Sequence, residues 1–87
     1  MNGKIPSDRG KPKIVVYAQS AHDAAQAGQF VKLYFTFVVI KTVVSGTHLI
    51  VYLSEGEVFH PLIRKFLLAR TGVIGASNVT RRNQKHQ

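Results

Sequence analysis

One 21-residue segment, residues 33–53, dominates the pattern of apolar and polar positions along the chain. Lys41 and His48 are its strongly polar interruptions. A segment of this length and composition is close to one helical crossing of a bilayer. A continuous apolar run does not reveal its own period, so the same residues also fit a buried helix or two strands. The sequence therefore supports three architectures.

The first architecture is a mainly α fold with a single membrane-spanning helix over residues 33–53. Ser20 is followed three residues later by Asp23, a spacing that resembles a capping box and predicts a helix that begins near Ala21. Residues 21–32 have good helix propensity except at Gly28, so this helix can continue into the apolar segment.

In such a helix, four polar side chains would lie on one face, because they follow one another at steps of four, three and four residues. They are Lys41, Ser45, His48 and Tyr52. A lysine that faces lipid at the bilayer centre costs roughly 2.5–3.5 kcal/mol on insertion scales. We therefore expect this polar stripe to face partner subunits, as a helix–helix contact rather than a proton path.

The other two architectures contain strands. Residues 31–44 and 47–53 can form a hairpin that turns at Ser45-Gly46, although a first strand of that length is unusually long. Alternatively, a strand over 13–18, a helix over 21–44 and a strand over 47–53 form a βαβ core, which gives a small α/β domain.

The last of these architectures ends its second strand just before the residues SEGEVF, positions 54–59. The order of strand, helix and strand, followed by such a phrase, is similar to that of the DsrE-type sulfur-relay proteins over about half of the chain. That resemblance implies persulfide chemistry on a cysteine, and the chain has none. It therefore implies at most a non-catalytic relative.

The segments around the apolar centre define the expected domain organisation. Residues 1–12 read as a flexible basic arm, residues 13–71 as one structural unit, and residues 72–87 as a flexible basic tail, of which 72–77 also fit a short strand. Within the unit, residues 62–70 predict a short amphipathic helix, with Pro61 in its first turn.

The composition combines a strong positive charge with a high content of apolar residues. The formal net charge is +8, with the excess on both flanks of the apolar centre, while 45% of residues are hydrophobic and 18% are charged. A strongly basic chain can neutralise phosphates, but so apolar a chain is more typical of a small membrane subunit with basic tails. We expect phosphate or lipid-headgroup contacts from Arg64, Lys65, Arg70, Arg81 and Arg82.

The sequence offers little catalytic chemistry. Ser45 and His48 have no acidic neighbour that would orient the imidazole, so a catalytic triad is unsupported. Glu57 and His60 have the spacing of half a di-iron site, but the chain has only four carboxylates. We expect no enzyme, no cofactor, no metal and no small-molecule substrate.

The leading hypothesis is a non-catalytic accessory subunit of a multi-subunit membrane complex, placed in the mitochondrial inner membrane, with protein subunits and lipid as partners. The alternative is a small basic RNA-binding structural protein of a cytoplasmic or organellar ribonucleoprotein such as the ribosome. In this RNA-binding alternative, Lys11 and Lys13 contact phosphates together with the other basic residues. Tyr34, Phe35 and Phe37 stack on bases if they are exposed. A second alternative is the non-catalytic, cysteine-free relative of the sulfur-relay proteins.

Overall fold

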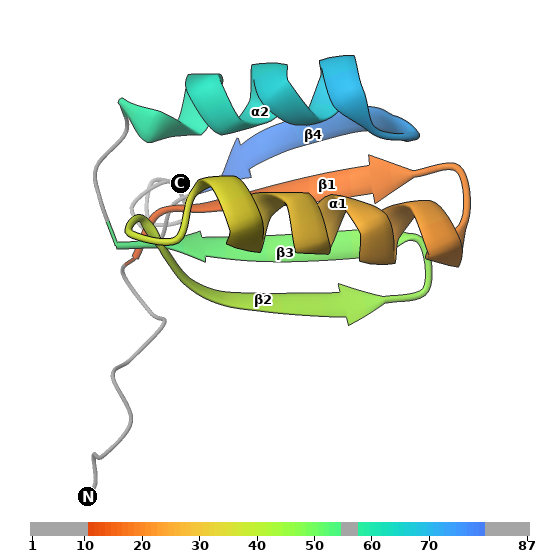
Figure 1. Cartoon of the computed structure of the whole chain (residues 1–87), viewed down its shortest axis with the longest axis horizontal. Helices are drawn as coiled ribbons and strands as arrows, with labels where there is room; N and C mark the ends of the chain where they lie inside the picture. Colours follow the sequence, from red (N-terminus) through yellow and green to blue (C-terminus); the bar gives the residue numbers. More distant parts are fainter. Residues whose placement is uncertain (1–10, 55–57, 80–87) are drawn as a thin grey trace, which may run out of the picture.

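The fold is a four-stranded sheet with two helices. A computed structural model describes residues 11–54 and 58–79. The elements are β1 (Lys13–Ala18), α1 (Ala21–Tyr34), β2 (Val39–Ser45), β3 (His48–Leu53), α2 (Phe59–Arg70) and β4 (Val73–Val79) (Figure 1). The strands lie in the order β2-β3-β1-β4, and every neighbouring pair is antiparallel. This is the split β-α-β, or ferredoxin-like, arrangement.

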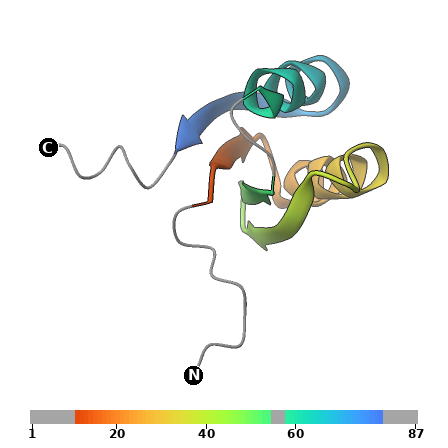
Figure 2. The same ribbon diagram turned by 90° about the vertical axis from the view of Figure 1, so that its left-hand side faces the viewer.

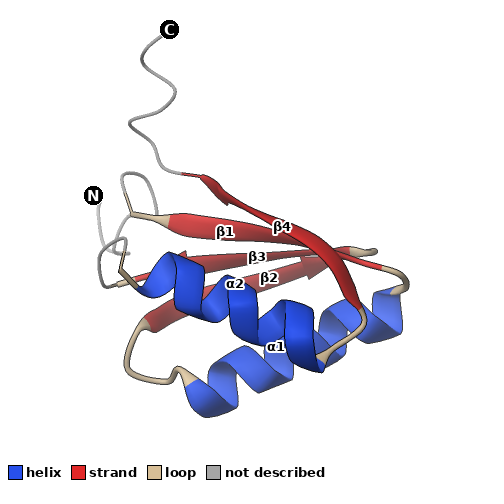
Figure 3. Ribbon diagram, turned by 90° about the horizontal axis from the view of Figure 1, so that it is seen from above, coloured by secondary structure: helices blue, strands red, loops and turns tan. Residues whose placement is uncertain are grey.

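The two helices form a single layer on one face of the sheet. The views in Figures 2 and 3 place α1 and α2 on the same side of all four strands. On the opposite face, no other element of residues 11–54 and 58–79 lies over the strands. The described part of the chain therefore has two layers, with one sheet face left open.

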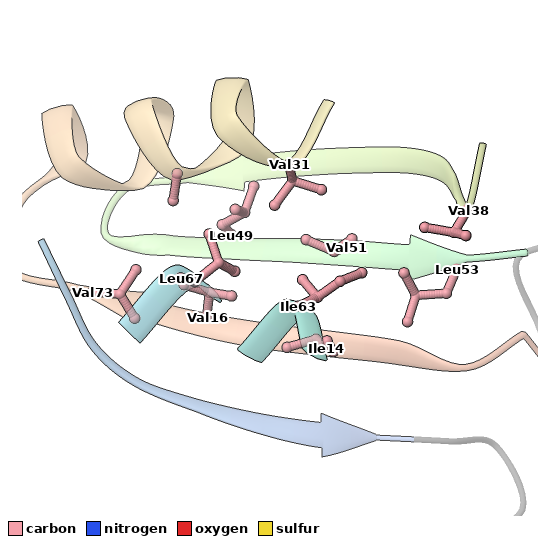
Figure 4. Packing of buried hydrophobic residues seen from close by; sticks show 11 residues of the cluster. Ile14, Val16, Val31, Val38, Leu49, Val51, Leu53, Ile63, Leu67 and Val73 are labelled. Carbon is pink, nitrogen blue, oxygen red and sulfur yellow. The ribbon is translucent and has the colours of Figure 1, made fainter. Parts of the chain in front are cut away.

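The hydrophobic core lies between the sheet and the helices (Figure 4). Its side chains come from β1 and β3, from both helices, from the residue before β2 and from the start of β4. They are Ile14, Val16, Ala27, Val31, Val38, Leu49, Val51, Leu53, Ile63, Leu67 and Val73. On β3, Leu49, Val51 and Leu53 are fully buried, which is the period of two expected of a strand with one covered face. Burial against the helix layer thus fixes which face of β3 points inward.

The start of α1 confirms the capping prediction. The hydroxyl oxygen of Ser20 accepts a hydrogen bond from the backbone N–H of Asp23 at 3.1 Å, and the helix begins at Ala21. Asp23 also places a negative charge in the first turn, where the helix dipole favours it.

The end of α1 overturns the membrane-spanning helix. Residues 33–53 contain the last two residues of α1, the whole of β2 and the whole of β3. Within the described residues, no helix has both the length and the apolar character that a bilayer crossing needs. The prediction of a mainly α, transmembrane protein was wrong, and the small α/β alternative fits. Residues 38–44 contain four valines, an isoleucine and a threonine, whose β-branched side chains favour strand over helix.

The two strand-containing architectures were each right in part. A hairpin forms and Gly46 has a positive φ of 58°, but the turn is at Gly46-Thr47, one residue later than the predicted Ser45-Gly46, and the first strand begins at Val39. A two-residue loop with glycine first and a positive φ there suits the twist of a hairpin. The βαβ prediction placed β1, the helix and β3 correctly in order, but the helix ends at Tyr34, and β1 and β3 are antiparallel neighbours.

The C-terminal part of the described chain also contains regular structure. The amphipathic helix predicted over 62–70 forms as α2 and begins earlier, at Phe59, with Ile63 and Leu67 buried on its inner face. β4 occupies residues that we assigned to the start of the tail, and it pairs with β1. Residues 1–10 of the predicted arm and 80–87 of the predicted tail lie outside the described residues.

Candidate functional site

The sheet face opposite the helices is the most distinctive surface of the described chain. It is formed by the residues of β1 and β3 that alternate with the buried ones, together with their register partners on β2 and β4, and we call it the open face. Its members are Lys13, Val15 and Tyr17 of β1, Lys41, Val43 and Ser45 of β2, His48, Ile50 and Tyr52 of β3, and Gly75 and Ser77 of β4. All of them are half-buried or exposed.

Strand register brings the polar and aromatic members of the open face together. Tyr17 of β1 lies opposite His48 of β3, and Lys13 lies opposite Tyr52. On the other side of β3, Lys41 of β2 is also the partner of Tyr52. Residues directly opposite on antiparallel strands point to the same face, so these side chains are neighbours on one surface.

At one end of the open face, two rings are in contact. The Tyr17 and His48 ring centroids are 5.1 Å apart, with the ring planes at 79°, an edge-to-face arrangement. Tyr17 is 37% exposed. This geometry leaves ring surface accessible to a flat ligand from the solvent side.

At the other end, Tyr52 lies between two cations. The Lys13 ammonium is 5.4 Å from the Tyr52 ring centroid, and the Lys41 ammonium is 5.7 Å from it. Both distances fall within the range of cation–π attraction. The Tyr17–His48 pair and Tyr52, at the two ends of the open face, are four residues apart along each central strand, or about 13 Å. A half-buried strip of Val15 and Ile50 lies between them.

The structure places all four residues of the predicted polar stripe on this surface, but for a different reason. In a helix they would share a face through steps of four, three and four. In the sheet, Lys41 and Ser45 lie an even number apart on β2, His48 and Tyr52 lie an even number apart on β3, and the hairpin pairs them. Their role as a partner-facing surface stays a prediction.

The other predicted contact residues lie elsewhere. Arg64, Lys65 and Arg70 belong to α2, on the helix side of the sheet, and the Arg70 guanidinium lies 5.4 Å from the Phe66 ring centroid. Arg81 and Arg82 lie outside the described residues. None of the three α2 cations is therefore on the open face.

The aromatic residues singled out in the sequence are also away from the open face. Tyr34 and Phe35 contact Phe66 of α2, with ring centroids 5.2 and 5.4 Å apart. Phe37, in the loop between α1 and β2, is 93% exposed.

Sequence reasoning missed Tyr17, which carries one end of the open face. The information was present in the short strand KIVVYA, where Lys13, Val15 and Tyr17 alternate with the buried Ile14, Val16 and Ala18. Because Val15 is as apolar as its buried neighbours, the alternation was hidden at its centre.

Charge on the described residues is almost entirely positive. Asp23, at the start of α1, is the only carboxylate side chain among residues 11–54 and 58–79. Within those same residues there is no group of three or more side chains suited to hold a metal ion. The open face offers aromatic rings, two ammonium groups, an imidazole and hydroxyls, a set that can stack on flat groups and attract anionic ones.

Comparison of the chain with family models, with curated proteins and with solved structures gives no match. The function proposed next therefore depends on the geometry of the open face.

Proposed function

We propose that the protein binds single-stranded RNA across the open face, as a non-catalytic component of a ribonucleoprotein. The observation that carries the proposal is the placement of Tyr17 and Tyr52 on the two central strands, with Lys13 and Lys41 beside the Tyr52 ring. Unpaired bases stack on accessible aromatic rings, and the phosphates between them attract ammonium groups.

A four-stranded sheet with an uncovered face has a physical precedent in this role. One established class of RNA-binding domain stacks two or three bases on aromatic side chains of such a sheet. The precedent is an analogy of fold, which by itself does not assign function. It agrees here with the side chains, because ring surface and positive charge coincide on the same face.

Single strands suit the open face better than duplexes. In a double helix the flat faces of the bases are stacked on one another, so an aromatic side chain cannot reach them without unstacking. A sheet whose aromatic rings lie about 13 Å apart can instead accommodate the splayed bases of an extended, single-stranded RNA. Two stacked bases supply roughly 2–6 kcal/mol, to which phosphate contacts add a salt-dependent term.

The test is fluorescence anisotropy with a labelled single-stranded RNA, in which Tyr17→Ala and Tyr52→Ala are compared with Tyr34→Ala. Tyr34 is the control, because it is an exposed tyrosine on the helix side of the sheet, away from the open face. Each open-face variant should weaken binding by about 5- to 150-fold, which corresponds to 1–3 kcal/mol per lost stack. The control should change affinity less than about twofold.

Two outcomes would contradict the proposal. One is a wild-type protein that does not bind single-stranded RNA at low salt, and the other is equal loss of affinity in all three variants. Duplex RNA and single-stranded DNA of the same sequence serve as further probes. Tighter binding of the duplex would refute the stacking mechanism, and equal binding of the DNA would show that the sugar is not read.

A further inference from the structure

The strand β2 forms one edge of the sheet, with β3 on one side and no strand of the described chain on the other. An edge strand presents backbone N–H and C=O groups that can pair with another strand. Natural edges are often protected by proline, by several charges or by irregular pairing. β2 contains no proline and a single charged residue, Lys41, and its Val43 and Val44 are 37% and 45% exposed.

The opposite edge, β4, is less suited to pairing. Its register against β1 shifts between Tyr17 and Ala18, and its regular part carries Gly75, Ala76, Ser77 and Asn78, which are small or polar. Such residues bury little apolar area in a new strand pair. The irregularity of β2 lies between Val39 and Lys41, so Lys41–Ser45 continues as regular strand.

Backbone geometry indicates which residues of β2 present their hydrogen-bonding groups to the outside. The residues that flank a two-residue hairpin loop form a hydrogen-bonded pair, which here is Ser45 with His48. Alternate residues of a strand direct their N–H and C=O groups to opposite sides. Thr42 and Val44 therefore direct theirs away from β3, toward the free edge.

This regular stretch is complementary to itself in one antiparallel register. With Val43 opposite Val43 of a second copy, Thr42 meets the second copy's Val44 as a hydrogen-bonded pair, and Lys41 meets its Ser45. No like charges are directly opposite, and the central valines and the Thr–Val pairs bring β-branched side chains together. A two-fold axis perpendicular to the sheet relates the two copies, so the contact is closed and does not propagate.

We propose that two copies of this chain pair along β2 in that register, to give one continuous eight-stranded sheet. The inference concerns the sheet edge and does not depend on RNA binding by the open face. The contact between the two β2 strands is short, so the dimer is weak, with a dissociation constant in the range of about 10 μM to 1 mM. Each chain carries a net charge of +8, so added salt screens the repulsion and strengthens the dimer.

The salt dependence separates the two proposals experimentally, because RNA binding weakens as salt rises. Sedimentation equilibrium of the wild-type protein over concentrations up to about 1 mM should show a monomer–dimer equilibrium that shifts to dimer in added salt. Val43→Lys places two ammonium groups opposite each other at the two-fold axis, and should weaken the dimer at least tenfold. Ile74→Lys adds the same charge on the 64% exposed Ile74 of the β4 edge, and should leave the dimer unchanged.

A single cysteine tests the register directly, since the chain has none of its own. Val43→Cys places two thiols on a pair that does not share hydrogen bonds, where the Cα atoms are about 4.5 Å apart and a disulfide can form. Mild oxidation should then yield a covalent dimer much faster than for Ser77→Cys on β4. A monomer at every concentration, equal loss of dimer in both lysine variants, or equal oxidation of both cysteine variants would overturn the proposal.

Discussion

The alternation along β3 predicts that alanine substitutions at two neighbouring residues destabilise the fold to very different extents. Leu49 is fully buried beneath the helices, whereas Ile50, the next residue, lies half-buried on the open face. Leu49→Ala removes about three carbons, worth roughly 2.4 kcal/mol by transfer at about 0.8 kcal/mol per methylene. The cavity left behind raises the expected loss to about 2.7–5 kcal/mol. Ile50→Ala leaves no enclosed cavity, and should cost about 1 kcal/mol or less.

The size of the domain makes this difference easy to measure. A domain of this length has a free energy of unfolding of roughly 3–10 kcal/mol, so Leu49→Ala removes a large share of it and Ile50→Ala a small one. Urea denaturation followed by far-ultraviolet circular dichroism is the assay, because the chain has no tryptophan to report by fluorescence. The RNA affinity of the folded fraction should respond in the opposite order, with Ile50→Ala the weaker binder.

Equal destabilisation by the two substitutions would refute this reasoning. It would mean that Ile50 is as enclosed as Leu49, so that something covers the open face in solution. A loss of the alternation over His48–Leu53 would also argue against β3 being a strand with one covered face.

Three further predictions concern close packing and charge. Gly72→Ala should lower the free energy of unfolding by about 1 kcal/mol or less, because the Asp23 carboxylate that a Cβ would overlap is the end of a side chain and can turn away; urea denaturation measures it, and a loss of several kcal/mol would contradict this reasoning. Gly28→Ala, where an added Cβ meets only ordinary contacts, should instead raise that free energy by roughly 0.5–1 kcal/mol through helix propensity. Replacement of both Lys13 and Lys41 by glutamine should make the slope of log affinity against log salt shallower by about 1.4 for single-stranded RNA, and no change in slope would place the phosphates elsewhere.

Local chemistry made part of the fold predictable. Four predicted features depend on neighbouring residues, and the structure contains them: the Ser20 cap, the strand over 13–18, a tight turn that uses Gly46, although one residue later than predicted, and an amphipathic helix around 62–70. A cap satisfies backbone N–H groups within one turn, and a positive φ favours glycine whatever the rest of the chain does.

The division of the apolar centre could not be read locally. Val43 and Ile50 are apolar and lie on the open face, while Val51 and Leu53 are apolar and lie in the core. Since both faces of β3 carry large apolar side chains, the period of two that identifies a strand disappears from the sequence. The same property hid the extent of the open face: the sequence singled out the four polar residues of the stripe, which lie on it, but it missed Tyr17 and the apolar residues between.

The position of β1 at the centre of the sheet has a consequence for how the chain folds. Lys13 pairs with Tyr52 on one side and with Val79 on the other, so the first strand finds both of its neighbours far along the sequence. Among the strand pairs of the described residues, only β2–β3 closes a short loop, and contacts between distant residues are slow to form. During synthesis, β1 therefore has no partner strand until β3 has left the ribosome, and the side of β1 that pairs with β4 stays unpaired until β4 follows. In that interval the apolar side chains of β1 are open to chaperones and to aggregation.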